Sequence, residues 1–172
     1  MGHGLHDLAR HNAWATAQVL AFCHGLDEQT LNTTVPGTYG TIVETLWHLI
    51  VAEGGYLRRL TGVATAFPWR EDDAAGLEVQ AQRAAMLAAT WDQFLAVDVD
   101  TERLGEGRGD RGEIFAIPAG VFITQALHHA NEHRAQICTI LGALGHEPPD
   151  VSAWAYARAT GRSTLTTPPS DA

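Results

Sequence analysis

The chain has 172 residues, of which 45% are hydrophobic and 18% are charged, a composition typical of one globular domain. Its 20 acidic residues outnumber its 11 basic ones and give a net charge of −9. Because an acidic surface repels phosphate backbones and anionic lipids, we expect neither nucleic acid nor a membrane as a partner. All eleven basic residues are arginines, which excludes Schiff-base and P-loop chemistry that depends on lysine.

The N-terminus has no basic segment leading into an apolar run, and no stretch of about 18 apolar residues occurs. We therefore expect a cytoplasmic protein. The two cysteines, Cys23 and Cys138, are far apart and form no C-x-x-C spacing. They are predicted to be buried apolar residues rather than metal ligands or a disulfide.

Apolar residues recur at helical spacing in four long segments. The predicted helices span residues 5–26, 41–62, 74–95 and 118–145, and a short helix is predicted over 152–159.

Local signals mark several helix ends and breaks. Thr41 and Glu44 match the capping box, in which each side chain binds a backbone N–H at the start of a helix. Gly145 is placed to end the last long helix. Asp27 to Tyr39 is predicted as a loop because it contains Pro36 and Gly37. Pro68 and the acidic run at 71–73 break the pattern before the third long helix.

The connection from residue 97 to 117 alternates weakly and contains four glycines, so it is predicted to be a loop or a short hairpin. Four long helices without a repeat predict an all-α fold, a four-helix bundle. We assign residues 1–162 to one helical domain and residues 163–172 to a polar, flexible tail.

The last long helix contains the sequence Leu127-His-His-Ala-Asn-Glu-His-Arg-Ala-Gln-Ile137. On a helical wheel, His129 and His133 lie on one edge of the apolar stripe, four residues apart, so their imidazoles can converge. His128 and Glu132 point away from the stripe. The pair is either two ligands of a metal ion or two polar residues at a helix edge.

The segment from His129 to His133 also spells H-x-x-E-H, the motif of inverted zinc proteases. That interpretation is disfavoured, because such enzymes require a further downstream acidic ligand and only Glu147 is available among glutamates beyond the motif. A metal site built on this helix needs a third ligand from elsewhere. The candidates are His3, His6, His11, His24, His48 and His146. The wheel places His48 nearly opposite the apolar stripe of its own helix, and on that evidence His48 is expected to be exposed.

Three segments in order along the chain resemble the DinB/YfiT-like superfamily of metal-dependent helical proteins. They are Leu8-Ala-Arg-His-Asn-Ala-Trp14, Thr45-Leu-Trp-His-Leu49 and His129-x-x-x-His-Arg-Ala-Gln136, although His11 stands where the family more often has tyrosine. The resemblance implies a four-helix bundle with one histidine ligand on the second long helix and two on the last. Carried over by motif, the metal ligands are His48, His129 and His133.

The resemblance further implies an enzyme, a transferase or hydrolase that activates a thiol or water against a small electrophile, as in relatives that use a low-molecular-weight bacterial thiol. Histidine ligation favours Zn or Ni, with Fe as a third candidate. A small-molecule substrate and a homodimer are also expected from the resemblance. The alternative is a non-enzymatic, stress-related bundle in which the metal is structural.

Catalytic residues cannot be assigned from the sequence. Glu53 is the nearest acidic residue on the helix of His48, but it lies about 140° away on the wheel, so it is not assigned as a general base. Arg134 follows a proposed ligand and has two interpretations: it binds an anionic substrate group, or it forms a surface or structural salt bridge. The five tryptophans are expected in the core or at an interface, with Trp14 and Trp47 as alternative pocket residues.

Overall fold

The computed structural model describes residues 3–62, 75–109 and 111–166. The predicted break at Pro68 and residues 71–73 lies outside the described residues, as does the 167–172 part of the predicted tail.

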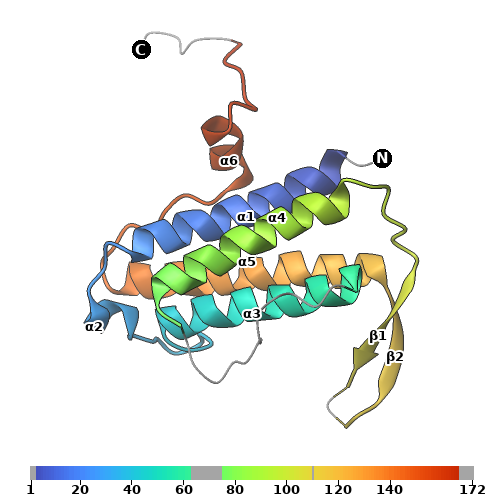
Figure 1. Cartoon of the computed structure of the whole chain (residues 1–172). Helices are drawn as coiled ribbons and strands as arrows, with labels where there is room; N and C mark the ends of the chain where they lie inside the picture. The colour runs from blue at the N-terminus through green and yellow to red at the C-terminus, as the bar shows by residue number, and fades with distance from the viewer. Residues whose placement is uncertain (1–2, 63–74, 110, 167–172) are drawn as a thin grey trace.

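Four long helices make up most of the molecule, which is mainly helical (Figure 1). They are α1 (His3–Cys23), α3 (Ile42–Thr61), α4 (Leu77–Leu95) and α5 (Ala119–Ala143). Helix α3 packs against both α5 and α4, and α1 packs against both α4 and α5. All four helices contribute to one buried apolar cluster, including Val19, Leu46, Trp91 and Ile137. The pairing of α3 with α5 is important because these two helices carry the histidines identified in the sequence.

The ends of the long helices agree with the sequence signals where those signals are specific. Thr41 and Glu44 form both hydrogen bonds of the predicted capping box. Helix α3 ends at Gly62, which has a φ of 71°. After α5, the amides of Gly145 and His146 bond to the carbonyls of Gly142 and Leu141, which is the Schellman arrangement predicted for a C-terminal glycine.

Three shorter elements complete the fold. Helix α6 (Ala153–Ala159) lies against α1 and agrees with the predicted short helix. Helix α2 (Glu28–Leu31) was not predicted, because it is a single turn inside a segment rich in loop residues. Asp27 caps this turn by accepting a hydrogen bond from the amide of Thr30.

The connection before α5 is a hairpin of β1 (Leu104–Arg108) and β2 (Ile114–Pro118), so the chain is not strictly all-α. The strands are antiparallel, with Leu104 opposite Pro118 and Arg108 opposite Ile114. A Cβ atom on Gly107 would meet the end of the Ile117 side chain, so a larger residue there would require Ile117 to move. In Figure 1 the hairpin extends from the end of the molecule where α5 begins.

No helix in the described part of the chain is both long enough and apolar enough to cross a membrane.

Candidate metal centre

The structure brings His48, His129 and His133 together across the contact between α3 and α5. One ring nitrogen from each histidine lies within 4.8 Å of those of the other two. His133 is buried, whereas His48 and His129 are half-buried, so one side of the cluster is open. The cluster could therefore hold a metal ion at the edge of the molecule, between two rigid helices.

The prediction from the wheel that His48 is exposed is wrong. The wheel assumes a helix with one buried face, but α3 is buried against α4 as well as α5. Residues nearly all round its second and third turns are buried, including Thr45, Trp47 and Leu49 as well as Leu46 and Ile50. The face that carries His48 therefore lies beside α5, and His48 is half-buried.

The ring nitrogens of the three histidines are suited to a cation better than to one another. The Nε2 atoms of His48 and His129 are 3.1 Å apart, and those of His129 and His133 are 3.2 Å apart. If Nε2 of His129 carries a proton, it can donate that proton to the Nε2 atom of only one neighbouring histidine. The Nε2 atom of the other histidine then faces a nitrogen that has no proton for it. A cation between the three atoms would satisfy all three lone pairs at once.

The spacing also fits an ion of the expected size. Zinc binds imidazole nitrogen at about 2.0–2.1 Å in a tetrahedral site, which places two ligand nitrogens about 3.3 Å apart. The observed separations of 3.1 and 3.2 Å are close to that value. Three protein ligands leave a tetrahedral ion with one position for another molecule.

Gln136 orients one of the three histidines. Its Oε1 lies 3.1 Å from Nδ1 of His133, so a proton on Nδ1 would be donated to the amide oxygen and leave the Nε2 lone pair toward the cluster. Burial also lowers the pKa of His133, and this effect exceeds the opposing hydrogen bond with Gln136. The neutral form of His133 that a metal requires is therefore favoured.

Two tyrosines flank the cluster. The ring of Tyr39 stacks on His48 with 4.0 Å between ring centroids and 21° between planes, and it meets His133 edge-on at 5.3 Å. Its backbone amide donates to Oε1 of Gln136 at 3.0 Å. The ring of Tyr56 meets that of His129 edge-on, with 6.1 Å between ring centroids.

Neither the position of the two tyrosines beside the cluster nor the role of Gln136 was predicted from the sequence. The signal for Gln136 was its place three residues after His133, on the same side of the helix. Tyr39 lies in a segment predicted as loop, where no periodicity indicates a direction for the side chain.

Two of the other candidate ligands, His11 and His146, make contacts elsewhere. Nε2 of His11 is 2.8 Å from the carbonyl of Val151, and the ring of His146 lies against Phe22. His128 pairs with the exposed Glu132 at 3.3 Å, as the wheel predicted for two residues directed away from the stripe.

A buried polar network connects the four long helices. The Arg134 guanidinium on α5 donates to Oδ1 of Asn12 at 2.8 Å and to Oγ1 of Thr16 at 3.0 Å, both on α1. Asn12 in turn donates to Oε1 of Glu53 on α3 at 3.0 Å. Trp91 on α4 donates to the same oxygen at 2.6 Å.

The position of Arg134 corrects one interpretation made from the sequence. Its exposed fraction is 2%, and its hydrogen bonds are directed at α1, so it does not face a substrate. Arg134 and Glu53 interact through Asn12 instead of by direct contact. The network links α1, α3, α4 and α5 by hydrogen bonds, and α3 and α5 are the helices that carry the three histidines.

Burial raises the pKa of Glu53 above its ordinary value of 4.5, although hydrogen bonds from Trp91 and Asn12 and the charge of Arg134 oppose the shift. The folded protein therefore binds this proton more tightly than the unfolded chain does. The stability contributed by the bound proton is complete below the unfolded pKa and is lost as the pH rises through the folded pKa.

Replacing Glu53 by glutamine is expected to remove the dependence of protein stability on pH that the Glu53 carboxyl group causes. In wild type, Glu53 contributes a decrease in the free energy of unfolding of up to about 1.4 kcal/mol per pH unit in the window that starts near 4.5 and ends at the raised pKa. Glu53→Gln keeps the acceptor oxygen and should give a flatter curve in urea unfolding over this range. The exposed Glu102→Gln is the control and should keep the wild-type slope; equal slopes in all three proteins would contradict the assignment.

The fold and the cluster define a class: a mainly helical protein with three histidines, from two adjacent helices, close enough together that they could bind a metal ion. The chain belongs to the DinB family, whose model matches residues 1–168.

The fold also resembles a solved one. A DinB-like protein from Bacillus cereus ATCC 10987 superposes with a TM-score of 0.63 and 16% identity, covering 83% of this chain and 91% of that one. At this identity the likeness concerns the fold alone. No curated protein sequence matches the chain.

Proposed function

We propose that this protein is a metal-dependent enzyme that activates a thiol or water for attack on a small electrophile. The observation that carries the proposal is the convergence of three Nε2 atoms, 3.1 and 3.2 Å apart in successive pairs, at a half-buried position. We further propose that the four long helices form a four-helix bundle of the DinB/YfiT type, with His48, His129 and His133 as the metal ligands.

A divalent ion held by neutral imidazoles lowers the pKa of a bound water or thiol and so supplies a nucleophile near neutral pH. Zinc and nickel are the first candidates, and iron is a third. In the reaction, sulfur or oxygen forms a bond to carbon, the leaving group departs with its electron pair, and the thiol or water proton passes to solvent. Tyr39 and Tyr56, whose rings lie against those of His48 and His129, would be next to a substrate bound at the cluster.

The alternative of a structural metal is less well supported by the core. The four long helices share an apolar cluster and a hydrogen-bonded network that do not include the three histidines. A protein held together in this way should fold without its ion, whereas small domains that depend on a structural metal unfold when it is removed. Circular dichroism before and after chelation separates the two cases: a lost helical signal would favour the structural role.

The catalytic proposal is tested with metal-depleted protein reloaded separately with Zn²⁺, Ni²⁺ and Fe²⁺. Thioether formation from cysteine or glutathione with 1-chloro-2,4-dinitrobenzene reports thiol activation, and hydrolysis of 4-nitrophenyl acetate reports water activation. One reloaded form is expected to exceed the metal-free protein by about 100-fold or more in one reaction. If every reloaded form binds its ion but none exceeds the metal-free rate, across a wider panel of thiols and electrophiles, the enzyme proposal is wrong.

A further inference from the structure

A cavity of about 430 Å³ lies beside the histidine cluster, between α3, α5 and the hairpin. Ala52 lines it from α3, four residues after His48, and Gln125 lines it from α5, four residues before His129. Four residues of helix span about 6 Å, so the cavity begins one turn from the cluster. Its volume lies within the range of small-molecule sites.

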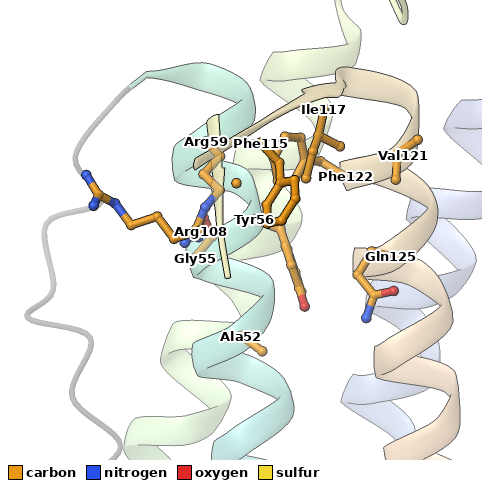
Figure 2. Close-up of a pocket in the computed structure, with 11 residues that line it drawn as sticks. Ala52, Gly55, Tyr56, Arg59, Arg108, Phe115, Ile117, Val121, Phe122 and Gln125 are labelled. Carbon is orange, nitrogen blue, oxygen red and sulfur yellow. The ribbon is translucent and has the colours of Figure 1, made fainter. Parts of the chain in front are cut away.

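Tyr56 connects the cavity with the histidines. It lines the cavity, and its ring also lies edge-on to His129 with 6.1 Å between centroids. Figure 2 shows the Tyr56 hydroxyl directed along the groove between α3 and α5, toward the level of Ala52 and Gln125. In the described part of the chain, neither the Tyr56 hydroxyl nor the Gln125 amide has a hydrogen-bond partner, so both can bind a ligand.

The opposite end of the cavity, which lies under the hairpin, is apolar. The side chains there are Phe115 and Ile117 of β2 with Val121 and Phe122 of α5. Phe115 and Val121 are 51% and 52% exposed, although each belongs to a wall of the cavity. An apolar body inserted between them would cover surface that is otherwise in water.

Arg59 supplies the charge at this end. Its Nη1 donates to the carbonyl of Gly55 at 3.0 Å, which holds the guanidinium over the wall of the cavity. No carboxylate of the described residues lies within ion-pair distance of Arg59, in a protein with a net charge of −9. The remaining N–H groups of the guanidinium therefore suit an anionic group. Arg108 lines the same end but extends outward from β1 in Figure 2.

We propose that this cavity binds a small molecule with an apolar body and an anionic group. Arg59 binds the anion, the hairpin side chains cover the apolar body, and the end held by Tyr56 and Gln125 faces the histidine cluster. That this molecule is the substrate of the enzyme rests on the function proposed above. Its binding to the cavity depends on none of the three histidines.

The test compares two fluorescent probes that share an aromatic body. 8-Anilinonaphthalene-1-sulfonate carries an anion, and N-phenyl-1-naphthylamine is neutral. In titrations of the full chain, Arg59→Gln is expected to weaken binding of the anionic probe about tenfold, and to change binding of the neutral probe less than twofold. Ala52→Phe, which places a large side chain in the cavity, should weaken binding of both probes. Arg111→Gln, in the turn of the same hairpin but outside the cavity, is the matched control and should weaken neither.

The outcome is separable from that of the metal proposal. The titrations are made on metal-loaded and metal-depleted protein, and the selective effect of Arg59→Gln is expected in both. Equal losses in Arg59→Gln and Arg111→Gln, or full binding of both probes by Ala52→Phe, would overturn the inference. Far-ultraviolet circular dichroism of each variant verifies that a variant with weakened probe binding is still folded.

Discussion

Replacing His48 or His129 by alanine is expected to reduce the bound metal from near one equivalent per chain to near zero. Each substitution removes one of three nitrogens whose spacing of 3.1 and 3.2 Å matches a shared ion. Two imidazoles hold a divalent ion loosely, and a stable site typically has three protein ligands. The measurement is elemental analysis of protein without a histidine tag, after incubation with zinc or nickel and removal of the free metal.

His128→Ala provides a matched control from the neighbouring position of the same helix. The His128 side chain is 65% exposed and pairs with Glu132, so its removal should leave the metal content unchanged. Loss of metal in all variants, His128→Ala included, would indicate binding at exposed histidines in general. Wild type that takes up neither ion would remove the basis of the proposed function.

The parts of the fold that were predicted correctly are those with a local cause. The capping box of Thr41 and Glu44 and the C-terminal glycine at 145 act over a few residues, so the sequence contains the whole signal. The convergence of His129 and His133 is also local, because four residues of helix place them on one face. The single turn of α2 was missed because one turn is too short for periodicity to be visible.

The burial of His48, the third histidine of the cluster, depends on tertiary structure. Whether the face of α3 that carries His48 is exposed depends on which helices pack beside it, and a wheel contains no such information. The motif resemblance identified His48 where the physical pattern did not. Arg134 gives the complementary case, since its position next to His133 suggested a substrate role, whereas the packing of α1 against α5 buries it among polar partners.

Replacing Arg134 by leucine is expected to lower the free energy of unfolding by about 3 kcal/mol. The substitution removes the donor to Oδ1 of Asn12 and leaves that buried oxygen unpaired. It also removes the cation that favours ionisation of Glu53. Part of the loss is offset, because Nε of Arg134 is itself buried without a hydrogen-bond partner in the described structure. Urea unfolding of metal-free protein measures the effect apart from any contribution of a bound ion.

The exposed Arg158→Leu removes a surface pair with Asp150 at 3.4 Å and should cost less than about 1 kcal/mol. If the network acts as a unit, Asn12→Leu and Arg134→Leu should cost less together than the sum of their separate costs, because each leaves the other's group unpaired. Additive costs would mean that the contacts are independent and do not jointly fix the helices. The position of His48 opposite His129 and His133 would then depend on the apolar packing of α3 against α5 alone.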